Sequence, residues 1–314
     1  MLTLPVLDEL PAGYFVEESP GGVAVLHADV LEPLHDAGFG PDSDGSLAPS
    51  ALSGRKPLFQ IEAGGETYLL RRFSHGGLMR WTTGARFLDA GRPFRELILS
   101  DALRRVGINT PQVVAARART NMGIGWRLEI MTRWIKDTID LGYVLGMAHR
   151  GELAPTIASR IAFEFGDLVR RMHLHGCVHA DLKPQNILVS RSALEGGEVR
   201  LWVIDLDRSF FTQALGNAER RSNLRQLYRH ISRRGKEHRA HLPRTDFARF
   251  LRGYDPERTR WKEDWREISA MRPFGSSLHR FGWLLERLFS SNVDPRVSGD
   301  VIYPHAPPPA PPAS

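Results

Sequence analysis

Apolar positions between residues 23 and 68 occur in short runs that Gly, Pro, Ser and Asp separate. Two runs, at 57–62 and 66–73, flank Ala63-Gly64-Gly65. A Gly-Gly pair between two apolar runs is typical of a β-hairpin turn. A further strand is predicted at 126–135. The first part of the chain is therefore expected to be rich in β-structure.

The spacing of apolar residues becomes helical further along the chain. In 93–106 they recur at about helical intervals, with Pro93 in the first turn and Gly107 after the last of them. A longer stretch of this kind, 154–175, keeps its apolar residues on one face. The remaining predicted elements are a helix at 139–146, strands at 187–189 and 201–204 with a turn at 191–198 between them, and a basic helical region from Glu219.

This order predicts an α+β fold with two lobes, a small N-terminal β-rich lobe and a larger, mainly helical C-terminal lobe. The change from strands to helices lies near Trp134, and the meeting of two lobes is a favoured ligand site. The predicted divisions are an N-terminal extension with the first strands (1–50), an N-lobe (51–134), a C-lobe (135–303) and a disordered tail (304–314), which has six prolines in eleven residues.

Composition excludes several classes of protein. The chain has 314 residues, 42% hydrophobic and 25% charged, which excludes a disordered or collagen-like chain. The single cysteine, Cys177, excludes an intrachain disulfide, favours a reducing compartment and is expected to be a small buried apolar residue. The N-terminal ten residues carry no basic side chain, and no apolar run reaches about 18 residues. We therefore expect a soluble intracellular protein.

The strongest chemical signal is a polar loop between apolar strands. Asp181 and Asn186 lie five residues apart in Val178–Val189, and Asp205 follows a further apolar strand nineteen residues later. Phosphoryl transfer needs a carboxylate that accepts the proton of the acceptor hydroxyl, and oxygen ligands for Mg²⁺. A loop Asp, a loop Asn and an Asp at a strand end supply these groups. The alternative is that these residues only cap turns.

This pattern resembles the protein-kinase-like superfamily and, within it, the bacterial lipopolysaccharide kinases that phosphorylate 3-deoxy-D-manno-octulosonic acid (Kdo) or core heptose. The resemblance spans roughly residues 55 to 235. The segments that carry it are His179-Ala180-Asp181-Leu182, Ile204-Asp205-Leu206-Asp207-Arg208, Tyr68 to Leu78 with His75-Gly76-Gly77, and Asn223-Leu224-Arg225-Gln226-Leu227-Tyr228-Arg229.

The resemblance implies ATP and Mg²⁺ as cofactors and assigns roles by position. Asp181 would be the catalytic base, with Lys183 beside the γ-phosphate, while Asn186 and Asp205 would bind Mg²⁺. Glu96 would pair with a cation on the preceding strand, Arg71 or else Arg72. Superfamily members more often have Lys there, and Arg offers a bidentate fork instead of a point charge.

Two nucleotide contacts are less specific. Gly54 and Arg55, in Ser53-Gly54-Arg55-Lys56, would place backbone N–H groups and cations over the phosphates. Adenine would bind through backbone groups near Met131 to Trp134.

The acceptor is expected to be a hydroxyl of a lipopolysaccharide inner-core sugar, with Kdo preferred. Lys183-Pro184-Gln185 looks more like a eukaryotic-type protein kinase. However, no Phe-Gly follows Asp205 and no Ala-Pro-Glu segment appears later, so a small or lipid-linked acceptor fits better. The alternatives are a protein Ser/Thr or small-molecule kinase of the same fold, a nucleotide-binding pseudokinase, or a structural protein that binds phosphate-rich surfaces.

Three features of the sequence can each be interpreted in two ways. His179 is expected to brace the loop instead of moving a proton, and Asp207 would hold the metal loop or cap the next turn. The segment 220–239 has eight Lys or Arg residues and one Glu. It forms either a solvated helix face or a contact with an anionic partner, phosphorylated lipid A or acidic phospholipid.

One face of that basic segment carries Leu224, Leu227 and Ile231, which would pack or dip into lipid headgroups. The protein would then lie on the cytoplasmic face of the bacterial inner membrane. No base-reading motif or aromatic stacking series is present, so nucleic acid is not expected as a partner.

Overall fold

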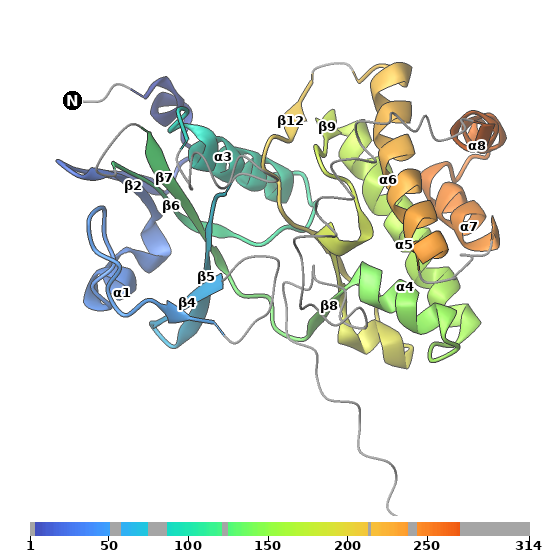
Figure 1. The fold of residues 1–314 in the computed structure, drawn as a ribbon, viewed down its shortest axis with the longest axis horizontal. Coiled ribbons are helices and arrows are strands. Elements are labelled where there is room, and N and C mark those ends of the chain that lie inside the picture. Colours follow the sequence, from blue (N-terminus) through green and yellow to red (C-terminus); the bar gives the residue numbers. More distant parts are fainter. Residues whose placement is uncertain are drawn as a thin grey trace, which may run out of the picture.

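A computed structural model describes residues 4–50, 58–74, 87–120, 125–212, 215–237 and 244–270. Figure 1 shows two lobes side by side, a β-sheet with one long helix and a larger lobe made mainly of helices. The change from sheet to helices falls after Arg133, close to the predicted position at Trp134. The α+β, two-lobed architecture predicted from the sequence is confirmed.

The N-lobe is built on one antiparallel sheet of seven strands in the order β1-β2-β6-β7-β5-β4-β3. The predicted hairpin forms between β4 and β5, and Gly64 and Gly65 both have positive φ (57° and 76°), as a tight hairpin turn requires. Because β2 pairs with β6, the predicted boundary at residue 50 falls within one sheet. The strands are β1 Tyr14–Ser19, β2 Gly22–His27, β3 Ala48–Pro49, β4 Leu58–Ala63, β5 Glu66–Arg72, β6 Val113–Thr120 and β7 Trp126–Arg133.

Helix α3 (Arg92–Arg105) packs on one face of this sheet, with Pro93 in its first turn. Phe94 and Leu97 of α3 are fully buried in an apolar cluster with β6 and β7. The other face of the sheet is covered by the short helices η2 (Ala28–Val30) and α1 (Leu31–Asp36). The N-terminal turn η1 (Pro5–Glu9) packs beside α3.

The same sheet also holds a buried group of charges. Arg117 of β6 and Glu129 of β7 are each 1% exposed, and Arg117 Nε donates to Glu129 Oε2 over 2.7 Å. Arg117 also donates to Asp44 Oδ1 and to two backbone carbonyls. Because a buried charge is costly unless it is paired and hydrogen-bonded, these contacts are what allow Arg117 to lie in the core.

The C-lobe begins with a short strand where a helix was predicted. Ile139 lies in β8, which pairs with β10, and the helix begins only after Asp140, whose side chain caps it by accepting from the Tyr143 N–H. The elements of this lobe are β8 Thr138–Asp140, α4 Leu141–His149, α5 Pro155–Leu174, β9 Cys177–Val178, η3 Pro184–Asn186, β10 Ile187–Ser190, η4 Arg191–Glu195, β11 Leu201–Val203, β12 Phe210–Phe211, α6 Asn217–Glu237, α7 Arg244–Tyr254 and α8 Trp261–Ala270.

The helices of the C-lobe pack around α5, which crosses α7 at close range. A Cβ atom added at Gly166 would lie 2.0 Å from the Phe250 carbonyl oxygen, and one at Gly253 would lie 1.9 Å from that of Phe163. Only glycine permits this approach. Leu224 and Leu227 of α6 are fully buried in the same core, so this apolar face packs inside the lobe and does not meet lipid headgroups.

No helix in the part of the chain that the structure describes is long and apolar enough to cross a bilayer.

Candidate active site

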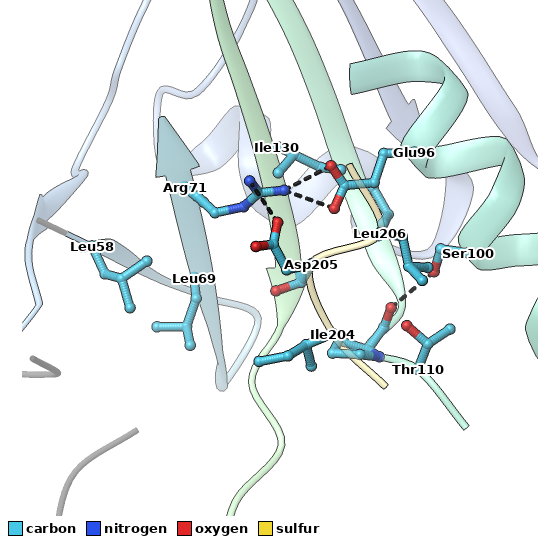
Figure 2. A pocket seen from close by; sticks show the side chains of 13 residues that line it. Leu58, Leu69, Arg71, Glu96, Ser100, Thr110, Ile130, Ile204, Asp205 and Leu206 are labelled. Atoms are coloured by element: carbon cyan, nitrogen blue, oxygen red, sulfur yellow. Dashed lines mark hydrogen bonds and ion pairs between the residues drawn. The ribbon is translucent and has the colours of Figure 1, made fainter. Parts of the chain in front are cut away.

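A cleft between the lobes contains a cavity of about 90 Å³ (Figure 2). Its walls come from both lobes, with Leu58 and Leu69 on the sheet and Ile204 after β11. These three residues and the buried Leu188 of β10 form one apolar cluster, with Trp134 packed against it. Apolar walls with a few polar groups are typical of small-molecule sites. The remaining lining residues are Arg71, Glu96, Ser100, Thr110, Pro111, Val113, Ile130, Thr132, Asp205 and Leu206.

The predicted pair of Glu96 with a strand cation forms with Arg71. Arg71 Nη2 donates to both carboxylate oxygens of Glu96 over 2.7 and 2.6 Å, and Nη1 lies 3.2 Å from Asp205 Oδ1 (Figure 2). The guanidinium fork thus joins a helix of the N-lobe to the metal-site candidate of the C-lobe. Arg72 points to the other face, where it pairs with Glu129 and stacks over the Phe59 ring.

Burial dominates the electrostatics of Glu96. Burial, together with the carboxylates of Asp205 and Asp207, raises the pKa of this carboxyl to about 7 against the opposing charge of Arg71. The carboxylates of Glu96 and Asp205 in turn raise the pKa of Arg71. Two carboxyl groups and one guanidinium thus line the cavity.

The loop after β11 has an unusual backbone. Asp205 and Arg208 have φ of 59° and 63°, the left-handed region that a non-glycine residue adopts only when its surroundings enforce it. Asp207 accepts two hydrogen bonds from Arg92 of α3, at 3.2 and 2.5 Å. Of the two roles left open for Asp207, the structure favours holding the loop. Sequence reasoning missed Arg92.

His179 braces the loop that carries Asp181, as expected. Its fully buried ring donates from Nε2 to the Ile204 carbonyl oxygen (3.0 Å) and accepts at Nδ1 from the Asp181 N–H (3.1 Å). Burial lowers the pKa of His179, so the ring is neutral and both nitrogens are used in bracing. The ring thereby joins the Asp181 loop to Ile204, the residue before Asp205.

The three predicted polar residues of this loop lie together. Lys183 Nζ is 2.7 Å from Asp181 Oδ2. The Asn186 amide nitrogen donates to the Asp181 carbonyl oxygen (2.8 Å) and lies 3.4 Å from Oδ2. Burial acts to raise the pKa of Asp181, but the hydrogen bond and charge of Lys183 outweigh it, so the pKa is held below its usual value. Asp181 is therefore ionised, as a proton acceptor must be.

Helix α6 supports this loop from the side, which the sequence did not reveal. Asn223 donates to the His179 carbonyl oxygen over 2.7 Å, and Gln226 donates to that of Ala180 over 2.9 Å. Asn223 also accepts from His173 of α5, and His173 bonds Tyr254 of α7. The sequence signals were the family resemblance of this segment and the spacing of Asn223 and Gln226, which puts both on one side of a helix.

Asn186 and Asp205 carry the kinds of oxygen donor that Mg²⁺ prefers. Among the described residues no three His, Cys, Asp or Glu side chains gather into a metal cluster. Mg²⁺ in nucleotide sites, however, is usually held by one or two protein oxygens together with phosphates and water. Asn186 turns its amide nitrogen towards Asp181, and the Asp205 carboxylate lies at the cavity wall. One amide oxygen and one carboxylate are a suitable protein donor set.

The predicted adenine contact lies in the described part of the chain, whereas the predicted phosphate contact lies outside it. The Met131 side chain is fully buried on the face of the sheet away from the cleft, while its neighbours Ile130 and Thr132 line the cavity. The N–H groups of Arg133 and Trp134 donate within the N-lobe, to Gln112 and Thr67. Four predicted features lie outside the described residues: Gly54, Arg55, the His75-Gly76-Gly77 segment and the tail 304–314.

The basic segment 220–239 is partly neutralised within the protein. Arg220 makes two hydrogen bonds to the fully buried Asp264 of α8, and Arg221 pairs with Glu263 and Glu267. These two charges are thus engaged by α8, and the last two residues of the segment lie outside the described ranges. Cys177 is buried, as expected, and burial raises its pKa to about 12.

Comparison with known proteins identifies the family. The sequence profile of the lipopolysaccharide kinase (Kdo/WaaP) family matches residues 61–254. This chain belongs to the lipopolysaccharide kinase (Kdo/WaaP) family. The match includes the Arg71, Glu96, Asp181 and Asp205 positions, and members of the family are kinases, so this protein is a phosphotransferase of the lipopolysaccharide kinase type.

Several relatives are Kdo kinases by name. The 3-deoxy-D-manno-octulosonic acid kinase of Stenotrophomonas maltophilia (strain K279a) is 31% identical over 69% of this chain and 83% of that protein. The Kdo kinase of Xanthomonas axonopodis pv. citri (strain 306) is 30% identical over 74% of this chain and 90% of that protein. A solved structure of WaaP in complex with acyl carrier protein covers 77% of this chain and 88% of that chain, at 23% identity and a TM-score of 0.48.

Proposed function

We propose that this kinase transfers the γ-phosphate of ATP to a hydroxyl of Kdo in the lipopolysaccharide inner core. The observation that carries the proposal is the link between two groups of polar residues through Ile204, whose N–H donates to the Asn186 carbonyl oxygen and whose carbonyl oxygen accepts from His179. Asp181, Lys183 and Asn186 lie on the C-lobe loop, and Arg71 joins Glu96 to Asp205 beside it. Relatives that carry the name Kdo kinase cover two thirds or more of this chain.

Each side chain has a defined task in this reaction. Asp181 accepts the proton of the acceptor hydroxyl, and Lys183 holds that carboxylate and steadies the γ-phosphate. Arg71, kept in place by Glu96, contacts the nucleotide phosphates. Mg²⁺, held by Asn186 and Asp205, would offset the charge of the transferring phosphoryl group. Most of the rate then comes from positioning and electrostatics and little from covalent chemistry.

The acceptor also bears on where the protein works. A lipid-linked sugar lies at a membrane surface, so we propose that the protein acts as a peripheral protein on the cytoplasmic face of the inner membrane. With Arg220 and Arg221 engaged by α8, other cations of α6 would have to supply the contact. Arg229, which is exposed, is one of them.

A phosphotransfer assay tests the function. Purified protein is incubated with ATP, Mg²⁺ and a Kdo-bearing lipid A precursor, and both ADP release and the mass of the acceptor are measured. We expect one added phosphate, and we expect Asp181→Asn to reduce the rate by roughly 10² to 10⁴-fold because the general base is lost. Asp101→Asn, which changes a carboxylate of α3 outside the cleft, is the matched control.

The alternatives give different results in the same assay. Phosphorylation of a generic protein substrate or an aminoglycoside, with no change in the Kdo acceptor, would indicate the other kinase activities. Thermal stabilisation by Mg-ATP without turnover on any acceptor would indicate a pseudokinase. Full activity of Asp181→Asn would contradict the proposed mechanism.

A further inference from the structure

One face of α6 follows the loop that carries the catalytic base. Asn223, Gln226 and His230 are spaced three and four residues apart, so they lie on one side of the helix. The first two donate to backbone carbonyl oxygens of the loop, at His179 and Ala180. The third reaches the catalytic side chain itself, with His230 Nε2 at 3.8 Å from Asp181 Oδ1.

The two oxygens of the Asp181 carboxylate are not equivalent. Oδ2 lies 2.7 Å from Lys183 Nζ and 3.4 Å from the Asn186 amide nitrogen. Oδ1 faces His230 at a distance too long for a direct hydrogen bond. A single oxygen atom at ordinary hydrogen-bond distance, about 2.8 Å, from both Oδ1 and Nε2 would bridge this separation without movement of either side chain.

Exposure distinguishes His230 from Asn223 on this face. Asn223 is buried, whereas the side chains of His230 and Asp181 are 37% and 41% exposed. Both side chains are therefore partly accessible, and we expect a substrate hydroxyl to reach them from solvent. A purely structural bracing residue would more typically be enclosed, as Asn223 is.

We propose that His230 is a residue of the acceptor site, whose Nε2–H donates to the oxygen of the hydroxyl that Asp181 deprotonates. This inference rests on the proposed function, because it needs a hydroxyl acceptor at Asp181. In the step, the hydroxyl O–H bond breaks and its proton passes to Asp181 Oδ1. The same oxygen forms the new O–P bond, and the electron pair of the old O–P bond leaves with ADP. A second lone pair of the acceptor oxygen accepts the hydrogen bond from His230 Nε2–H.

This contact would act mainly on the chemical step. The acceptor oxygen becomes more negative as its proton leaves, so a donated hydrogen bond strengthens in the transition state. Removal of the donor should therefore lower kcat for the acceptor more than it raises the acceptor KM. The KM for ATP should not change, because His230 does not line the cavity between the lobes.

The test compares three variants of the full-length protein with saturating ATP and varied Kdo-bearing acceptor. We expect His230→Ala to lower kcat by roughly tenfold to a hundredfold. His230→Gln should recover much of this loss because its amide nitrogen can stand where Nε2 stands. His149→Ala removes an exposed histidine at the end of α4 and should behave like the wild type. Thermal unfolding of each variant reports on the fold.

The outcomes separate this inference from the proposed function. A wild-type protein that modifies no sugar acceptor would overturn the proposed function and, with it, the role of His230. An active wild type with an equally active His230→Ala would overturn the role of His230 alone. Equal losses in the Ala and Gln variants, accompanied by a lower unfolding temperature, would make His230 a structural residue and also overturn the proposal.

Discussion

The loops that carry Asp181 and Asp205 are neighbours, because His179 beside Asp181 bonds the carbonyl oxygen of Ile204 beside Asp205, but different forces hold them. The Asp181 loop is braced by neutral groups of its own lobe, chiefly His179 and the α6 residues Asn223 and Gln226. The Asp205 loop is held by charges of the other lobe, since Arg71 reaches Asp205 and Arg92 reaches Asp207.

This difference has a physical consequence for the two loops. Buried hydrogen bonds between neutral groups respond little to ionic strength and keep the base in a fixed position within the C-lobe. Ion pairs across a cleft weaken as salt increases, and they are lost when the lobes separate. The base is therefore part of a rigid lobe, whereas the metal-site candidate Asp205 couples the two lobes.

Among the changes that test this difference between the loops, breaking the charge link at Arg71 has the largest expected effect. We expect Arg71→Met to lower kcat/KM for ATP by roughly 10² to 10³-fold, because a cation near the phosphates and the contact to Asp205 are lost together. The kcat/KM of Arg71→Lys should lie between those of the wild type and Arg71→Met. One ammonium keeps the charge but cannot reproduce a guanidinium fork that contacts both Glu96 and Asp205. Steady-state kinetics with varied ATP measure both variants.

Arg105→Met is the control for these variants. It removes an exposed arginine of α3 that pairs only along its own helix, with Asp101. Surface pairs of this kind contribute about 0 to 1 kcal/mol, so its kinetics should match the wild type. Wild-type kcat/KM in Arg71→Met would show that the link between the lobes is not needed for nucleotide use.

The bracing of the Asp181 loop should be sensitive to acid. Burial lowers the pKa of His173 to about 4, from an ordinary value near 6.5. Between these values the unfolded chain binds more protons than the folded one, so the free energy of unfolding rises with pH and reaches its full value above about pH 6.5. It should fall by up to about 3 kcal/mol as the pH drops from 6.5 to 4.

Urea unfolding of the wild type and of His173→Leu at several pH values measures this contribution. His173→Leu should be less stable at neutral pH, because Asn223 and Tyr254 lose their partner, but it should have a shallower pH dependence. In His173→Leu, the buried and neutral His179 still contributes part of the pH dependence of the unfolding free energy. Identical slopes in the two proteins would contradict the prediction.

Local features made much of the fold predictable. The β4–β5 hairpin and helices α3 and α5 form within one or two residues of their predicted bounds, because turn residues and apolar spacing are signals within a single segment. Ile139 was predicted in a helix but lies in β8. Its strand conformation depends on pairing with Val189, fifty positions later, which no local pattern encodes.

The candidate site divides in the same way. Asp181, Asn186 and Asp205 were recognised from their spacing, but Arg92 was not, because its partner Asp207 is 115 residues away in sequence. The pairing of Arg220 in the basic segment was missed for the same reason. Its partner is the buried Asp264 of α8, 44 residues further on. Partners contributed by distant elements are visible only in the folded chain.

The smallest expected effect is the coupling between Arg92 and Asp207, and it tests the comparison of the two loops directly. Both side chains are mostly buried, at 15% and 23% exposed, and Arg92 also stacks over the Phe87 ring. A double-mutant cycle with Arg92→Met and Asp207→Asn cancels the stacking term and isolates the ion pair. We expect a coupling of about 1 kcal/mol in unfolding free energy at low salt. The exposed Arg105–Asp101 pair on α3 should give less than half of this, about 0.3 to 0.5 kcal/mol.

Raising the salt to about 1 M should reduce both couplings. An Arg92–Asp207 coupling that persists unchanged in high salt would mean that the pair is closed off from solvent like the His173–Asn223 hydrogen bond, so the two loops would then be held by forces of the same kind.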